Sequence, residues 1–299
     1  MFIKRHIWTI IFCVLITGFS LYLIMDTFVI SRVYTVVDED NGGENGIEDA
    51  TADDNAEISG NTYSDENITI TLTEYREYDT SIYVADIIVS SAEYLKTAFA
   101  EGSYGRNVTA KTSEIAEDVG AVIAINGDYY GAREGGYVLR NGVLYRSVSL
   151  SDQEDLVIYS DGSFEIITEE DISAEELLED GAEQVFSFGP ALITDGLISV
   201  TEDDEVGKAK ASNPRTAIGI IDDLHFLFVV SDGRTSESEG LSLSELAEFM
   251  SGFNVVTGYN LDGGGSSTMY FNGEVVNKPT TSGNSIKERS VSDIVYIGY

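Results

Sequence analysis

Short apolar runs joined by tight turns recur through most of the chain, and this pattern constrains the fold more than any other feature. The turns Asn141–Gly142, Asp161–Gly162 and Asp222–Asp223 each separate two runs of strand-forming residues. A two-residue turn between such runs predicts a hairpin, whose strands are antiparallel. Further strands are predicted for the runs at 67–75, 81–89, 121–126 and 290–299.

Helices are predicted to be few and short. Residues 113–120, 174–181 and 242–252 have helical spacing, and Ser242 or Ser244 can cap the last of them. Residues 91–100 are interpreted as helical or turn-like. Many hairpins with a few short helices indicate an α+β fold with a mixed, mostly antiparallel sheet in a single globular domain.

An apolar run from Ile7 to Met25 has the length needed to cross a bilayer. Basic residues precede it and Asp26 follows, which predicts a cytoplasmic N-terminus and an extracellular domain. A cleaved signal peptide is the alternative. Because no small-residue cleavage site follows the run, we expect an uncleaved single-pass anchor in the cell membrane.

The segment after this run is strongly acidic. Residues 38–57 contain no basic side chain and almost no large apolar one, which is typical of a disordered, self-repelling stalk. The predicted organisation is therefore a signal anchor at 1–30, an acidic stalk at 31–64 and a globular domain at 65–299.

Charge and composition exclude several functions. The formal net charge of -35 argues against nucleic acid as a partner and against peripheral binding to anionic lipid. The single cysteine, Cys13, lies in the apolar run, so the domain has no disulfide. His225 is the one histidine beyond the N-terminus, and its apolar strand-like surroundings favour a core or strand-end position over a catalytic triad.

Polar clusters follow or precede several of the predicted strands. They are Asn126–Asp128, Asn213–Thr216, Ser231–Arg234 and Asp262–Ser267. Taken singly, Asn126–Gly127 and Asp232–Gly233 are ordinary turn dipeptides. Strand ends on a rigid sheet are nevertheless where loops gather into a site, so together the clusters indicate one.

The glycine-rich stretch after Asp262 exposes backbone N–H groups that a ligand can approach closely. It lacks the Gly-Lys-Ser/Thr of a nucleotide-binding loop and the Gly-x-Ser-x-Gly of a nucleophile elbow. The clusters also supply carboxylates and guanidiniums. Two carboxylates suit cleavage of a glycosidic bond, and arginine with backbone N–H groups suits a phosphate, so we expect a substrate that carries both.

These clusters, in this order, resemble the phosphodiester glycosidase family, with its bacterial exopolysaccharide-biosynthesis relatives. The resemblance covers about residues 65–299. It rests on the stretches AINGDYYG (124–131), VLRNGVLYR (138–146), FSFGPALITDG (186–196), NPRTAIG (213–219), SDGR (231–234), NLDGGGSSTM (260–269) and ERSVSDIVYI (288–297). It implies hydrolysis of a sugar-1-phosphodiester at the C1–O bond, which frees the sugar and leaves a phosphomonoester.

The resemblance also implies roles for matching residues. The catalytic candidates are Asp262 and Asp128, with Asp232 in reserve. The substrate-binding candidates are Asn126, Arg215, Arg234, Gly263, Gly264, Gly265, Ser266 and Arg289. Arg215 and the amides of 263–266 are expected to bind the phosphate, and Arg289 to close the site; acid and base are not assigned separately.

A cell-surface glycopolymer or related glycan is the expected substrate of an anchored domain of this kind. The net charge of -35 opposes an anionic polymer, which a locally basic site or a bound divalent cation such as Ca2+ would reconcile. Nothing in the sequence requires the metal. Ser231 stands where an aliphatic or acidic residue is more usual in the family, a tolerable departure.

Two non-catalytic functions compete with the hydrolase. The first is a membrane-tethered polysaccharide-binding or exopolysaccharide-assembly factor, for which Tyr129 and Tyr130 would stack on sugar rings. The second is a regulator of wall hydrolases that acts through its acidic surface and weakens with salt. Turnover separates the hydrolase from both.

Overall fold

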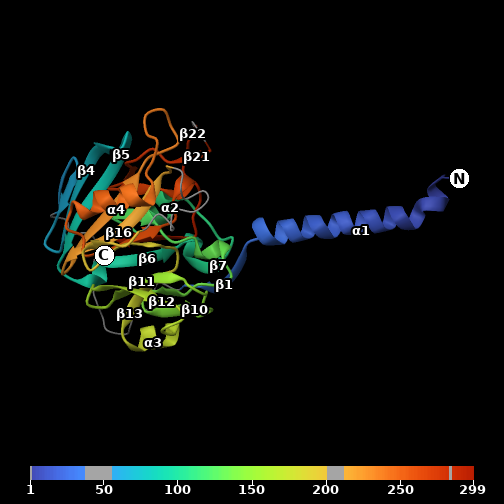
Figure 1. Cartoon of the computed structure of the whole chain (residues 1–299), viewed down its shortest axis with the longest axis horizontal. Helices are drawn as coiled ribbons and strands as arrows, with labels where there is room; N and C mark the ends of the chain where they lie inside the picture. Colours follow the sequence, from blue (N-terminus) through green and yellow to red (C-terminus); the bar gives the residue numbers. More distant parts are fainter. Residues whose placement is uncertain (1, 38–55, 201–211, 283–284) are drawn as a thin grey trace.

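The computed structural model describes residues 2–37, 56–200, 212–282 and 285–299. Three antiparallel sheets make the body, and a long helix leaves it on one side (Figure 1). The four α-helices of the described residues are α1 (Phe2–Phe28), α2 (Thr112–Asp118), α3 (Ala174–Glu179) and α4 (Leu243–Ser251). The predicted α+β class with mostly antiparallel sheets is confirmed.

The largest sheet has nine strands. Their order is β15 (Leu197–Ile198), β14 (Ala191–Thr194), β18 (Thr257–Leu261), β16 (Arg215–Asp222), β17 (His225–Ser231), β5 (Thr80–Val89), β4 (Ile68–Glu77), β3 (Thr62–Ser64) and β2 (Glu57–Ser59). Tyr78 and Asp79 both have positive φ, as the tight turn between β4 and β5 requires. The predicted β16–β17 hairpin is also present.

Two five-stranded sheets complete the body. One has the order β20 (Glu274–Val275), β19 (Met269–Phe271), β8 (Ile123–Asn126), β23 (Asp293–Ile297) and β6 (Leu95–Phe99). The other has the order β10 (Val143–Arg146), β9 (Val138–Arg140), β13 (Ala182–Phe186), β11 (Glu154–Tyr159) and β12 (Phe164–Thr168). Thr280–Ser282 (β21) pairs with Ser285–Ile286 (β22) in a small separate sheet.

The main core lies where the three sheets meet. Ile70 of β4, Phe228 of β17, Val295 of β23 and Leu156 of β11 belong to one buried cluster. Helix α4 covers the other face of the nine-stranded sheet with Leu246 and its neighbours. This packing fixes the ends of β8, β18 and β23 relative to one another, and the candidate site is built from these ends.

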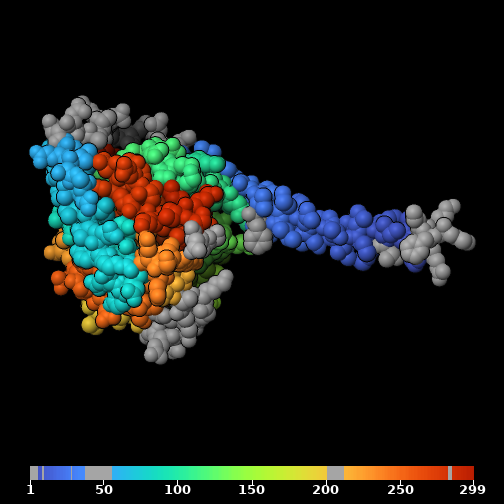
Figure 2. Space-filling view, turned by 90° about the horizontal axis from the view of Figure 1, so that it is seen from above, coloured from blue at the N-terminus to red at the C-terminus, as the bar shows by residue number. Residues whose placement is uncertain are grey.

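Helix α1 projects from the body as an exposed rod (Figures 1 and 2). Its segment His6–Thr27 is long and apolar enough to cross a membrane, and none of it is buried in the protein. Asn107 anchors the base of the rod by donating from Nδ2 to the carbonyls of Thr27 and Ile30, at 3.2 and 3.1 Å. Strand β1 (Arg32–Val36) follows and pairs with β7 (Ser103–Arg106).

Two local predictions are corrected. Residues 32–36 and 57–64 of the predicted stalk form strands, because β1 pairs with β7 and the β2–β3 hairpin extends the large sheet beside β4. Residues 38–55 of that stalk lie outside the described residues. In the segment 91–100, interpreted as helical or turn-like, Ala92–Tyr94 form a single 3-10 turn, but Leu95–Phe99 form β6, because they pair with β23.

Candidate active site

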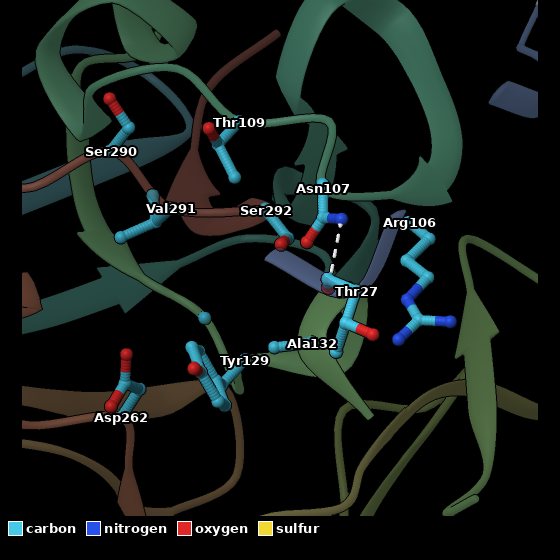
Figure 3. Close-up of a pocket in the computed structure, with 12 residues that line it drawn as sticks. Thr27, Arg106, Asn107, Thr109, Tyr129, Ala132, Asp262, Ser290, Val291 and Ser292 are labelled. Atoms are coloured by element: carbon cyan, nitrogen blue, oxygen red, sulfur yellow. Dashed lines mark hydrogen bonds between the residues drawn. The ribbon is translucent and has the colours of Figure 1, made fainter. Parts of the chain in front are cut away.

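A pocket of about 230 Å³ opens where the ends of β8 and β18 meet the segment that precedes β23 (Figure 3). Gly127 and Tyr129 follow β8, and Asp262 follows β18. Residues 290–292 form another part of the wall, and Arg106, Asn107 and Thr27 line the side toward α1. The pocket therefore joins segments that are far apart in the sequence.

Asp262 is held rigidly at the pocket. Its backbone N–H donates to the carbonyl of Gly127 at 3.2 Å, and its carbonyl accepts from Asn126 Nδ2 at 2.6 Å. Asn126 is fixed in turn, because its Oδ1 accepts from the Thr216 hydroxyl at 2.8 Å and from the amide of Thr268 at 3.3 Å. Asn126, predicted to bind substrate, does not line the pocket and instead holds Asp262 in position.

The two oxygens of the Asp262 carboxylate have different surroundings. Oδ2 accepts from Ser266 Oγ at 2.6 Å and from Arg289 Nη2 at 2.6 Å. Oδ1 accepts from no other side chain among the described residues. Asp262 lines the pocket, and Oδ1 is its carboxylate oxygen without a side-chain partner among the described residues.

Burial and ion pairing act on Asp262 in opposite directions. Burial raises the pKa of this carboxyl, whereas the Arg289 guanidinium, the Ser266 hydroxyl and the Gly263 amide lower it, and the net direction is upward. A raised pKa makes the carboxylate a stronger base than an exposed aspartate, while the ion pair keeps it ionisable.

The glycines after Asp262 allow neighbouring residues to pack closely against the backbone. Gly264 has a φ of +65°, and its N–H donates to the carbonyl of Pro214 at 2.8 Å. A Cβ at Gly264 would lie 2.7 Å from Arg234 Nη2, and one at Gly265 would lie 2.9 Å from Thr281 Cα. Since the amides of Gly264 and Ser266 are bonded to carbonyls, the structure corrects their predicted role as phosphate ligands.

Asp128 lies outside the pocket, contrary to prediction. Its side chain is fully buried, and its Oδ2 is 2.9 Å from Arg140 Nη2 and 3.0 Å from the amide of Ser187. Arg140 also binds Asp293, at 2.8 Å. A substrate cannot reach this carboxylate, so its acid/base assignment is corrected to a structural one.

The Asp232 carboxylate also forms its hydrogen bonds outside the pocket. Its Oδ1 accepts from the amide of Lys278 at 2.8 Å and from Asn277 Nδ2 at 3.3 Å, and Asn277 in turn holds the carbonyl of Ser267. Burial raises the pKa of Asp232. Through Asn277, Asp232 supports the loop that follows Asp262, and it does not line the pocket.

Arg215 and Arg234 pack around the same loop. Arg215 is buried and donates from Nε to the carbonyl of Leu241 at 2.8 Å. Arg234 reaches Asn213 Oδ1 from Nε and Nη2, at 3.2 and 3.1 Å. Neither lines the pocket, and the predicted arginine Arg289 forms an ion pair with Asp262 at 2.6 Å.

The sequence analysis missed the wall of the pocket on the α1 side. Arg106 ends strand β7, which was not predicted, and Asn107 follows it; the one local signal is the turn-prone Asn107, which has a φ of +55°. Tyr129 was noticed as a sugar-stacking residue, and its side chain is 46% exposed at the pocket. The described residues contain no group of three or more His, Cys, Asp or Glu arranged to hold a metal ion.

Comparisons with known proteins agree with this architecture. The catalytic domain of zebrafish N-acetylglucosamine-1-phosphodiester alpha-N-acetylglucosaminidase, solved in a form auto-inhibited by its pro-peptide, superposes with a TM-score of 0.62 at 18% identity. The match covers 91% of this chain and 89% of that one. A hypothetical protein from Synechocystis matches with a TM-score of 0.55 at 15% identity, over 78% and 62% of the two chains. These structures show the fold.

Sequence relatives identify the family. The mouse enzyme N-acetylglucosamine-1-phosphodiester alpha-N-acetylglucosaminidase is 31% identical over 60% of this chain and 37% of its own length. The SPbeta prophage-derived uncharacterized protein YomE of Bacillus subtilis is 27% identical over 60% of this chain and 28% of its own. The chain thus spans about a third of these relatives. A phosphodiester glycosidase family model matches residues 119–298, and the chain belongs to that family.

Proposed function

We propose that the protein hydrolyses a sugar-1-phosphodiester at the C1–O bond, with Asp262 as the catalytic carboxylate. One observation carries the proposal: Asp262 lines a pocket with its Oδ2 held by Arg289 and Ser266 and its Oδ1 left for a ligand. The mouse relative is named for its action on an N-acetylglucosamine-1-phosphodiester, so an ester of this sugar is the first substrate to test.

One carboxylate is enough for this reaction because the leaving group is weakly basic. Cleavage of an ordinary glycoside expels an alkoxide and needs a general acid beside a base or nucleophile. Cleavage of a glycosyl phosphodiester expels a phosphomonoester, whose second pKa is only about 6. A guanidinium near the departing oxygen can stabilise that charge without donating a proton. We assign this role to Arg106, which lines the pocket.

In the proposed mechanism Asp262 acts as a general base. Its Oδ1 takes a proton from water, the water oxygen bonds to C1, and the C1–O electron pair passes to the phosphate oxygen. The raised pKa of Asp262 suits this task, because a stronger base abstracts a proton more readily. Tyr129 provides an exposed ring at the pocket against which a sugar can stack.

The cellular setting is also a proposal. Helix α1 would act as a signal anchor in the cell membrane, with the N-terminus in the cytoplasm and the domain outside. A glycosyl-phosphate polymer or related glycan of a bacterial cell envelope would then be within reach. A cleaved signal sequence is the alternative reading of the same helix, and mass spectrometry of the cellular protein distinguishes them.

The test is hydrolysis by the full-length chain in detergent, with a panel of sugar-1-phosphodiesters that includes alpha-linked N-acetylglucosamine esters. Each ester is assayed with Ca2+ and with EDTA, because the metal requirement is open. We expect released sugar that disappears in Asp262→Asn. Retention of glycan without release, by a folded protein, would favour the polysaccharide-binding function and contradict the hydrolase.

A further inference from the structure

A second cavity of about 250 Å³ lies beside the candidate active site, between β1, β7 and the turn after β8. Its wall contains four arginines, three tyrosines and one carboxylate: Arg32, Arg106, Arg133, Arg146, Tyr34, Tyr104, Tyr130 and Glu134. The whole chain has 17 basic residues against 52 acidic ones. Four arginines around one cavity therefore create a local positive site in a strongly acidic protein.

Two of these guanidiniums have no carboxylate partner among the described residues. Arg146 donates to the carbonyls of Gly136, at 2.6 Å, and of Arg133, at 2.8 Å. Arg133 donates to the carbonyl of Ser187 at 3.0 Å. Carbonyl partners orient a guanidinium but leave its positive charge uncompensated, so the cavity favours an anion.

The other two arginines each bind one carboxylate. Arg106 pairs with Glu134 at 3.0 Å, and the Glu134 side chain is 83% exposed. Arg32, whose side chain is 45% exposed, pairs with Asp26 at the end of α1, whose side chain is 22% exposed. Exposed ion pairs contribute little and exchange easily, so both guanidiniums can turn to a phosphate. Clustered arginines with a planar donor fork are well suited to phosphate oxygens.

The cavity is placed at the base of the apolar helix. Arg32 and Tyr34 lie on β1, directly after α1, and Thr27 of α1 lines the neighbouring active-site pocket. Apolar side chains are exposed here, among them Val29 and Val33 at 58% and 51%. If α1 spans the bilayer, both cavities lie at its surface, where tyrosine side chains are favoured.

The two cavities adjoin each other, since Arg106 and Gly131 line both. A substrate can therefore place a sugar at Asp262 and its phosphate among the arginines. The charge of that phosphate increases when the C1–O bond breaks, because a diester becomes a monoester. The arginines would then bind the departing group more tightly as the reaction proceeds.

We propose that this arginine cavity binds the phosphate of a lipid-linked sugar phosphodiester, whose hydrocarbon chain lies in the bilayer beside α1. Water adds to C1, the C1–O electron pair goes to the phosphate oxygen, and the lipid keeps the phosphate as a monoester. The inference rests on the proposed function and narrows its substrate class. The cavity is also a locally basic site, one of the two ways to reconcile the net charge of the chain with an anionic substrate.

Binding is tested first, without turnover, on the full-length chain in a non-ionic detergent. Dodecyl phosphate, methyl phosphate and inorganic phosphate are titrated by calorimetry. We expect dodecyl phosphate to bind about tenfold more tightly than methyl phosphate, because it occupies both the arginines and the apolar surface at α1. Equal binding of the two esters would overturn the lipid assignment.

The arginines are tested with the double variant R32Q/R133Q and the single variant R32Q. We expect the double variant to weaken dodecyl phosphate binding about tenfold or more, and R32Q to give part of that loss. Arg76→Gln is the matched control, since Arg76 is exposed on β4 and lines neither cavity. Since the Arg32 side chain is 45% exposed, R32Q is expected to fold normally. Unchanged binding in both variants would overturn the site.

Hydrolysis then separates this inference from the proposed function. The dodecyl and methyl phosphodiesters of N-acetylglucosamine are compared on the wild-type chain, with about tenfold higher kcat/KM expected for the dodecyl ester. Binding of dodecyl phosphate without hydrolysis of either ester would contradict the proposed function and leave the phosphate site standing. Equal hydrolysis of both esters, unaffected by R32Q/R133Q, would contradict the inference and leave the hydrolase standing.

Discussion

Two arginine–carboxylate clusters of this molecule look alike in sequence and differ in structure. Asp262 and Asp128 each follow a buried apolar strand, and each binds an arginine, Arg289 or Arg140. The Arg289 side chain is 38% exposed and leaves one oxygen of Asp262 at a pocket. Arg140 is 1% exposed and closed in by Asp128 and Asp293. Exposure of one carboxylate oxygen, and not the local motif, distinguishes a reactive group from a structural one.

The largest effect on stability is expected from Arg140→Met. Removal of the guanidinium leaves Asp128 and Asp293 buried with no cation, and breaking a buried ion pair from one side typically costs about 3–5 kcal/mol. Urea unfolding of the full-length chain measures the loss. Arg76→Gln provides the control and should change the free energy of unfolding by less than about 0.5 kcal/mol. A comparable change in the two variants would show that the buried cluster does not stabilise the fold.

Arg289→Gln should act on the reaction more than on the fold. Arg289 lowers the pKa of Asp262, so its removal raises that pKa further. A general base must be ionised, and the acid limb of the kcat/KM profile should therefore move to higher pH. We expect about tenfold lower activity near neutral pH. An acid limb that stays in place, measured from pH 4 to 9, would contradict the role of Arg289.

Tyr129→Ala probes the sugar-facing wall of the pocket. Loss of a stacking ring removes about 1 kcal/mol of binding, which corresponds to a KM roughly fivefold higher. Because Tyr129 is 46% exposed, the free energy of unfolding should change little. Tyr22→Ala on the exposed face of α1 is a matched tyrosine control. A fall in kcat with unchanged KM would indicate a chemical role for Tyr129 instead of a binding one.

A pH-dependent effect on stability is expected from a buried acid beside the structural cluster. Burial, with Glu169 close by, raises the pKa of Asp155 to about 10. The folded chain therefore keeps a proton that the unfolded chain loses above about pH 4, and stability should fall as pH rises between these values. The slope from this group is at most about 1.4 kcal/mol per pH unit. Asp155→Asn should flatten it in urea unfolding at pH 6 and 8, and an unchanged slope would exclude Asp155 as its source.

Much of the fold could be predicted because its signals are local. Turn dipeptides such as Asn141–Gly142 predict hairpins within a few residues. The helix at 243–251 begins after Ser242, one of the two predicted caps. Strand β6 was missed because it depends on pairing with β23 at the other end of the chain. Strands β2 and β3 have three residues each and are stabilised by the large sheet beside them.

The site could be predicted only in part for the same reason. Asp262 and Arg289 were found through motifs, but no local signal shows that Asp128 faces Arg140 and Asp293 instead of a pocket. The arginine cavity could not be predicted from the sequence either, because Arg32 and Arg146 come together only when β1 pairs with β7. Net charge averages over the surface and cannot reveal such a concentration.

The most direct test compares Asp262→Asn with Asp128→Asn, two identical changes of chemistry in the two clusters. For each full-length variant, kcat on the best ester and the free energy of unfolding are measured together. Asp262→Asn should lower kcat about 1,000-fold and leave stability within about 1 kcal/mol. Asp128→Asn should lower stability by about 2 kcal/mol and keep kcat within about tenfold. Loss of kcat in a stably folded Asp128→Asn, with activity retained in Asp262→Asn, would contradict the account.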